Sequence, residues 1–138
     1  MPQSLQTTPL TELHRRLGAR LVPFAGYDMP VQFAEGIIRE HLHTRQEAGL
    51  FDVSHMGQIM VSGEQAVAEL EALMPANLRD LGIGQSTYAL LTNTEGGVYD
   101  DLIITRYSET AFFLVVNGAC KAQDLHLILT GCATASVD

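Results

Sequence analysis

The sequence predicts an α+β fold built on a ferredoxin-like antiparallel sheet with helices on one face. From about residue 55 the segments follow the order strand, helix, two or three strands, helix and a possible last strand, which is typical of a split βαβ arrangement. Residues 86–117 are rich in Tyr, Thr, Ile, Val and Phe, and polar turns at 93–97 and 108–110 divide them into strands. Residues 1–52 do not fit this order. We therefore expect 1–52 to be an N-terminal arm, part of an incomplete first domain, and 53–138 to be a C-terminally truncated ferredoxin-like domain.

The N-terminal elements follow from their apolar spacing and their turn residues. "TPLTELHRRLGA" predicts a short helix with Thr11 as its N-cap and Gly18 as its stop. "RLVPFAGYDMPVQF" predicts an extended segment broken by turns at its Pro and Gly residues. It is interpreted as an arm packed on the surface, or as one wall of a pocket for a planar ligand or an interdomain contact. "GIIREHLHTRQEAGLF" predicts an amphipathic helix that ends at Gly49.

The C-terminal elements are predicted in the same way. "FDVSHMGQIMVSG" favours a strand interrupted at Gly57, and "GEQAVAELEALMP" favours a helix that ends before Pro75. After the three strands, "CKAQDLHLIL" predicts a shorter helix with Leu125, Ile128 and Leu129 on one side. "ATASVD" could begin one more strand.

Composition narrows the functional classes. The chain has 138 residues, of which 46% are hydrophobic, and a formal net charge of −8, so it is a globular chain without the clustered cations that a nucleic-acid partner requires. Cys120 and Cys132 lack CxxC spacing and are expected to be free thiols. No stretch approaches the roughly 18 apolar residues of a membrane helix, and the N-terminus resembles no signal peptide. We therefore expect a cytoplasmic protein without nucleic-acid or membrane partners.

Two adjacent aspartates, Asp100 and Asp101, open an apolar strand. Adjacent strand residues point to opposite faces, so one carboxylate should face inward, where it needs a partner. One interpretation is that Asp100 caps the glycine turn at 96–97 while Asp101 is solvated. The other is that a carboxylate held among apolar neighbours such as Leu102 and Ile104 binds a ligand with protonatable amines.

A second polar cluster lies in "GLFDVSHMG". Asp52 and Ser54 are residue types that cap chain ends, and His55 is a polar side chain at an apolar strand entry. The cluster is either a hydrogen-bonded junction that sets the path of the chain or a pocket wall where Gly57 lets a ligand approach the backbone. No metal is expected, because His41 and His43 lie two residues apart and point to different faces of their helix.

In order and spacing, "TPLTELHRRLGARLVPFAGYDMPVQF", "AGLFDVSHMG" and "GGVYDDLI" resemble the N-terminal part of the glycine cleavage system T-protein family, the aminomethyltransferases. The resemblance runs from about Thr8 to Leu129. It implies one part of a three-domain fold around a folate-binding channel. It also implies transfer of a methylene group from the aminomethyl-lipoyl arm of the H protein to tetrahydrofolate, with release of ammonia. Tetrahydrofolate would be a co-substrate and the lipoylated H protein a partner in glycine catabolism and one-carbon metabolism.

The same resemblance implies site residues. The second aspartate of the family's "DD" pair, here Asp101, is the catalytic carboxylate near the reactive folate nitrogens. Tyr88 lines the folate site and Met56 lies near the pterin, while His55 and Asn117 are carried over as residues of the pocket neighbourhood.

Members of this family are more than twice as long as this chain. The further length supplies a glutamate and arginines that grip the folate tail, so we expect the isolated chain to be inactive. The alternatives are a non-enzymatic folate-binding relative of the iron–sulfur assembly type and the folate-binding portion of a sarcosine or dimethylglycine dehydrogenase. A ferredoxin-like interaction module with no ligand is a third option.

Overall fold

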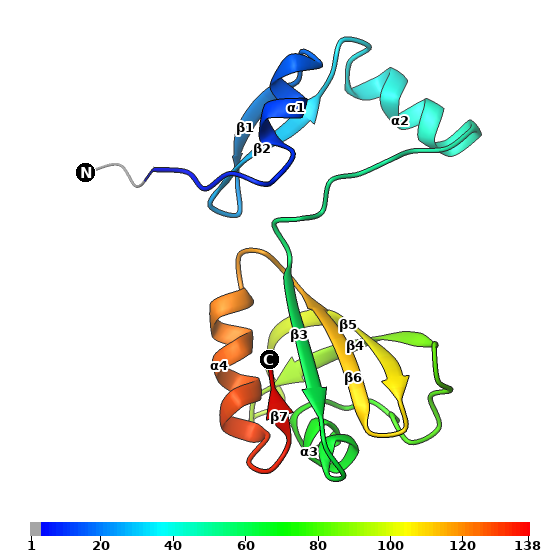
Figure 1. Ribbon diagram of the computed structural model, residues 1–138, viewed down its shortest axis with the longest axis vertical. Helices are drawn as coiled ribbons and strands as arrows, with labels where there is room; N and C mark the ends of the chain where they lie inside the picture. Colours follow the sequence, from blue (N-terminus) through cyan, green and yellow to red (C-terminus); the bar gives the residue numbers. More distant parts are fainter. Residues whose placement is uncertain (1–3) are drawn as a thin grey trace. The chain divides into compact units, whose positions relative to one another are not determined.

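The computed structural model describes residues 4–138, and the chain divides into two compact units, one that ends at His55 and one that begins at Met56 (Figure 1). The elements of the first unit are α1 (Thr11–Arg16), β1 (Arg20–Phe24), β2 (Tyr27–Gln32) and α2 (Ile37–Gln46). Those of the second are β3 (Gly57–Ser62), α3 (Ala66–Leu73), β4 (Ser86–Thr92), β5 (Val98–Ser108), β6 (Ala111–Val116), α4 (Lys121–Gly131) and β7 (Ser136–Val137).

The predicted turn-broken segment is a β-hairpin. β1 and β2 pair antiparallel, and Phe24 lies opposite Tyr27 across a two-residue turn. The turn residues Ala25 and Gly26 have φ of 50° and 83°, the left-handed values that a tight hairpin turn requires. Gln6 adds a parallel bridge to Tyr27. The first part of the chain is therefore a small folded unit.

Helix α1 begins one residue earlier than an N-cap at Thr11 would allow. Leu10 occupies the N-cap position and makes no side-chain cap bond. Thr11 lies inside the first turn, where its hydroxyl accepts a hydrogen bond from the backbone N–H of Thr8 at 2.9 Å. The predicted cap is wrong because this hydroxyl supports the chain before the helix. The stop at Gly18 is confirmed, with φ of 75° just after the last turn.

Helix α2 forms as predicted but ends at Gln46, with Glu47 as its C-cap, before the expected stop at Gly49. None of its residues is buried within the described structure. Ile38 is 75% exposed, so the apolar face of this helix is open to solvent.

The second unit has the predicted ferredoxin-like architecture. Its sheet has the order β4-β5-β6-β3-β7, and each adjacent pair runs antiparallel. The strands β3, β5, β6 and β7 with helices α3 and α4 make the split βαβ arrangement, and β4 adds an edge strand next to β5. The turns predicted at 93–97 and 108–110 separate β4, β5 and β6.

The core of this unit lies between one face of the sheet and the helices α3 and α4 (Figure 1). The buried side chains from the sheet are Ile59, Val61, Ala89, Leu91, Leu102, Ile104, Phe112, Leu114 and Val116. The helices and the segments that follow them contribute Ala66, Leu70, Met74, Leu78, Ile128 and Cys132. Because strand side chains alternate, the intervening residues of β4 and β5 lie on the opposite face, away from these helices.

Helix α4 turns a different side inward from the one its apolar residues predicted. Ile128 is buried as expected, but Leu125 and Leu129 are 38% and 52% exposed. Asp124, four residues before Ile128, takes the inner position and is completely buried. The prediction was wrong because it ranked positions by hydrophobicity alone, whereas residues four apart share one helical face.

Candidate functional site: the open sheet face around Asp101

Asp101 lies on the face of the sheet opposite to α3 and α4. It pairs with Leu90 of β4, and the next residue of β5 on that face, Ile103, pairs with Tyr88. Asp101 is exposed, and Tyr88 is 75% exposed. The register therefore puts a carboxylate and a phenol on one solvent-facing surface of two adjacent strands.

Asn117 follows the last residue of β6 and binds Asp101 directly. Its Nδ2 donates to the carboxylate Oδ1 of Asp101 at 3.2 Å and to the backbone oxygen of Asp101 at 3.0 Å. The same amide donates to Oδ1 of Asp100 at 3.1 Å. A single side-chain amide thus holds two neighbouring carboxylates whose strand positions face opposite ways.

The inward carboxylate of the pair is Asp100. It shares its face with the buried Leu102 and Ile104, and its Oδ2 is buried without a hydrogen-bond partner. It does not cap the glycine turn, because Oδ1 of Asn93 takes that position and accepts from the backbone N–H of Gly97 at 2.7 Å. The interpretation of Asp100 as a turn cap is therefore wrong.

Asp124 is the neighbour of the candidate site that the sequence did not predict. Burial, followed by the hydrogen bond and the charge of Asp100, raises its pKa to about 7. Burial and then the charge of Asp100 also raise the pKa of the Cys120 thiol. An acidic residue in the first turn of a helix normally faces solvent, where its negative charge interacts favourably with the positive end of the helix dipole. The sequence feature that indicates the burial of Asp124 is its position four residues before Ile128, which places both side chains on one face of the helix.

Met56 and His55 lie on either side of the division between the units. Met56 immediately precedes β3 and is partly buried. His55 packs its ring edge-on against Phe24 and Tyr27, with centroids 5.5 and 6.3 Å apart. The histidine is thus a neighbour of the β1–β2 hairpin.

Packing within the second unit requires a glycine at position 57. A Cβ at this position would lie 2.6 Å from Cγ2 of Val116 and 2.8 Å from Cβ of Lys121. The residue leaves room for β6 and for the start of α4, which accounts for it without a ligand that approaches the backbone.

Asp52 makes the polar segment before β3 a hydrogen-bonded junction. Its Oδ2 accepts from Nε2 of His14 and from the hydroxyl of Thr8, each at 2.8 Å. Its Oδ1 accepts from the backbone N–H and the hydroxyl of Ser54. Burial alone would raise the pKa of Asp52, but the bonds from Ser54, His14 and Thr8 outweigh it and hold that pKa well below its usual range. The junction interpretation of this cluster is therefore supported.

Replacement of this carboxylate should destabilise the N-terminal unit. We expect Asp52→Asn to lower its free energy of opening by about 2 kcal/mol at neutral pH, because hydrogen bonds to a buried charge are lost. The folded-state pKa is depressed, so the wild-type stabilisation is present above about pH 4 and is lost as the pH falls further. Amide hydrogen exchange in α1 and β1 measures both effects.

Glu35→Gln is the matched control for that variant, since it removes a carboxylate from the exposed pair with Arg39. We expect Glu35→Gln to change the free energy of opening, as measured by hydrogen exchange, by less than about 1 kcal/mol. Equal effects of the two variants would contradict the role given to Asp52.

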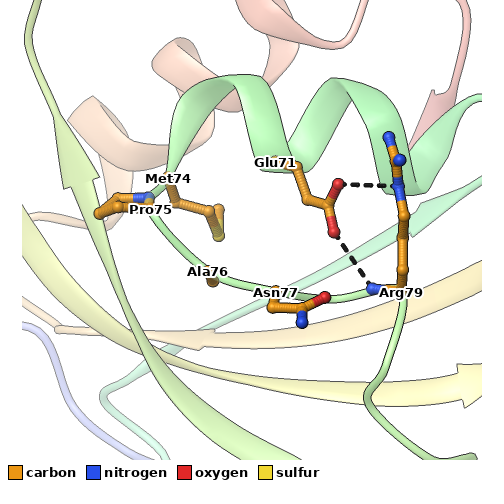
Figure 2. Close-up of a pocket in the computed structure, with 6 residues that line it drawn as sticks. All are labelled: Glu71, Met74, Pro75, Ala76, Asn77 and Arg79. Atoms are coloured by element: carbon orange, nitrogen blue, oxygen red, sulfur yellow. Dashed lines mark hydrogen bonds and ion pairs between the residues drawn. The ribbon is translucent and has the colours of Figure 1, made fainter.

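Two hollows lie elsewhere on the chain. The smaller, about 490 Å³, is lined by residues of the α3 end and the loop after it (Figure 2). Its acidic group is already satisfied, because Glu71 accepts from the backbone N–H groups of Leu78 and Arg79 and pairs with the Arg79 side chain at 3.0 Å. The larger hollow, about 1050 Å³, lies in the N-terminal unit between β2, α2 and residues 48–52. Neither of these two hollows is lined by Asp101.

Within residues 4–138 no group of three or more His, Cys, Asp or Glu side chains is placed to hold a metal ion. Among the helices of this described part, none is both long and apolar enough to cross a membrane. Cys120 and Cys132 are free thiols.

Comparison with known proteins identifies the family of the chain. A family profile described as the GCVT N-terminal domain matches residues 10–138. The chain belongs to the aminomethyltransferase family of the glycine cleavage system. It is 46% identical over 121 residues to the mitochondrial aminomethyltransferase of Dictyostelium discoideum, which covers 88% of this chain and 30% of that protein. It is also 46% identical over 121 residues to the aminomethyltransferase of Thermus thermophilus, with 88% of this chain and 34% of that protein covered.

A solved structure of a protein of this family has the same fold as this chain. The crystal structure of glycine cleavage system aminomethyltransferase T from Bartonella henselae matches with a TM-score of 0.93 and 43% sequence identity. The match covers 97% of this chain and 38% of that one. The chain therefore spans about a third of the length of the relatives it matches.

Proposed function

We propose that this chain supplies the catalytic carboxylate of a tetrahydrofolate-dependent aminomethyltransferase. In the proposed reaction the methylene carbon leaves the aminomethyl-lipoyl arm of the H protein and forms bonds to N5 and N10 of tetrahydrofolate. The products are 5,10-methylenetetrahydrofolate, ammonia and the dihydrolipoyl H protein. One observation carries the proposal: Asp101 is exposed on an open sheet face and is held there by Asn117. Family membership supplies the chemical context.

A carboxylate suits this reaction because the charge that develops is positive. As a folate nitrogen attacks an iminium-like carbon, Asp101 would stabilise the cation and orient the attacking amine. Tyr88, on the same sheet face, offers a flat ring against which the pterin can pack. The proposed route needs no covalent protein nucleophile.

Further parts of the proposal rest on the family. The partner is a lipoylated H protein, and Met56 and His55 belong to the neighbourhood of the pterin. Residues 1–52 and 53–138 form parts of two domains of the family's larger fold. The two free thiols favour a reducing, cytoplasmic compartment. The names of the matched relatives favour a transferase over the non-enzymatic and dehydrogenase-linked alternatives.

We also propose that the isolated chain does not sustain turnover. It spans about a third of its relatives, and the N-terminal unit leaves large apolar side chains exposed, as surfaces that receive further protein do. These side chains are Ile37, Ile38, Leu42, Leu50, Phe51 and Val53.

The test compares two proteins. In a chimera, this chain replaces the aligned N-terminal part of the Thermus thermophilus relative, to which it is 46% identical. With aminomethylated H protein and tetrahydrofolate, we expect methylene transfer by the chimera and none by the isolated chain. Turnover by the isolated chain would refute its inactivity. A folded chimera that neither binds folate nor transfers would refute the proposed function.

A further inference from the structure

Behind the open face, two carboxyl groups meet in the core of the second unit. Asp124 of α4 is completely buried, and neither of its carboxyl oxygens has a hydrogen-bond donor. The side chain of Asp100 on β5 interacts with Asp124 and raises its pKa, and Oδ2 of Asp100 is likewise buried without a hydrogen-bond partner. An ionised carboxyl group can only accept hydrogen bonds, so two ionised groups here would leave all three buried oxygens unsatisfied. A single proton between them removes both the repulsion and the missing donor.

Within the described residues, burial and the neighbouring Asp100 are what raise the pKa of Asp124. Asp100 faces it from β5 and the Cys120 thiol from the turn before α4. β3 and β6 carry no titratable side chain. On α3, the two glutamates are bound elsewhere: Glu69 accepts from Thr134 and Ala135, and Glu71 from Leu78 and Arg79. Lys121, in the first turn of α4, has its side-chain stem beside Gly57.

The buried pair is connected to the open face through one amide. Nδ2 of Asn117 donates to Oδ1 of Asp100 at 3.1 Å and to Oδ1 of Asp101 at 3.2 Å. The position of that amide therefore depends on where the Asp100 carboxylate lies. Oδ2 of Asp100 is the buried oxygen that remains free to accept a hydrogen bond.

We propose that below neutral pH Asp124 is protonated in the folded protein, donates that proton in a hydrogen bond to Asp100, and so acts as a positioning residue for Asp101 through Asn117. The hydrogen bonds from Asn117 to both aspartates are contacts within this chain. The proposed proton, which completes a hydrogen-bond relay to Asp101, accounts for the buried oxygens of Asp100 and Asp124 that otherwise lack a hydrogen-bond partner. The importance of this relay for catalysis rests on the function proposed above for Asp101.

The relay should be sensitive to pH near neutrality. The pKa of Asp124 is raised to about 7, first by burial and then by Asp100. Because the folded-state pKa lies above the unfolded value, this group's stabilisation is complete below about pH 4 and is lost as the pH rises through about 7. When Asp124 ionises, like charges repel and Asp100 loses its donor. The hydrogen bond from Asn117 to the Asp101 carboxylate should then weaken.

Carbon-detected NMR of the labelled chain tests the relay without folate. We follow the carboxyl carbons of the three aspartates and the side-chain amide of Asn117 from about pH 4 to about pH 9. The expected result is a midpoint near neutral pH for Asp124 and the same midpoint in the Asn117 amide signals. A transition of Asp124 near the ordinary aspartate pKa of about 4 would overturn the proposal.

Two variants separate positioning from simple packing. Asp124→Asn keeps an N–H donor toward Asp100 but cannot titrate, so the Asn117 signals should stay at their low-pH positions at every pH. Asp124→Leu fills the space without a donor, so those signals should lie near the high-pH positions throughout. If both variants give identical Asn117 and Asp101 signals, the positioning role is refuted even where stability changes.

The chimera distinguishes this inference from the function it rests on. We expect Asp124→Leu to lower kcat by roughly tenfold or more, through a displaced carboxylate, and Asp124→Asn to retain most of the activity. If Asp124→Leu has full kcat while Asp101→Asn has little, the positioning role fails and the proposed function stands. If the NMR relay behaves as expected but the chimera does not bind folate, only the proposed function fails.

Discussion

Asp101→Asn in the chimera should lose most of its methylene-transfer activity while it still binds tetrahydrofolate. We expect kcat to fall by about a hundredfold to a thousandfold, the usual effect of removing a preorganised group that stabilises transition-state charge. Asparagine has the same shape and can still interact with Asn117, so the geometry of the open face should persist. Tetrahydrofolate affinity should fall far less than kcat, since the carboxylate acts on charge that develops during the reaction. Single-turnover transfer and a folate titration measure the two quantities separately.

Glu95→Gln is the matched control, because it removes an exposed acidic group from the turn that leads into β5. It should leave both kcat and folate affinity unchanged. Near-normal turnover of Asp101→Asn would refute the role assigned to this carboxylate. Equal losses in the two variants would point to the net charge of the surface instead.

Phe112→Ala should destabilise the second unit by about 3–5 kcal/mol, which approaches the whole stability of many small domains. Phe112 is completely buried and pairs with Val61 across β3 and β6. The Arg106 guanidinium also lies 5.9 Å from the centre of its ring. Removal of the ring leaves a cavity beneath the sheet that carries Asp101 and Asn117. Amide hydrogen exchange in β3 and β6 reports the loss for this unit alone.

The adjacent Phe113→Ala is the control for that experiment. Phe113 lies on the opposite face of β6 and is only partly buried, so the same truncation should cost less than half as much. Comparable costs at the two positions would show that the core does not lie on the helix-covered face of the sheet.

The sequence predicted the second unit well because its signals are local. Period-two alternation and glycine- or asparagine-rich turns identify β4, β5 and β6, and the order of elements then permits few sheets. The N-terminal unit was harder to predict. Its hairpin contains Pro23 and Pro30, which argue against strand, and it forms because Ala25 and Gly26 adopt left-handed φ values that no periodicity records. Its helix α2 shows an amphipathic pattern without a buried face in this chain.

The candidate site was predictable only in part. Alternation shows that Asp100 and Asp101 face opposite ways, but cannot say which one is buried; the resemblance to a family directed attention to Asp101. Asp124 could not be found from hydrophobicity, because a completely buried acid is tolerated only next to a suitable partner such as Asp100. That partner lies across the core, and its proximity is a tertiary fact. The bridge made by Asn117 likewise depends on the register between β5 and β6.

The most direct measurement is the crystal structure of the chimera with a stable folate analogue such as 5-formyltetrahydrofolate. We predict that the pterin lies on the open face of the sheet, with the Asp101 carboxylate within about 3.2 Å of a folate nitrogen and the Tyr88 ring in contact with the ligand. A folate bound away from this face, with Asp101 still in water, would contradict the account.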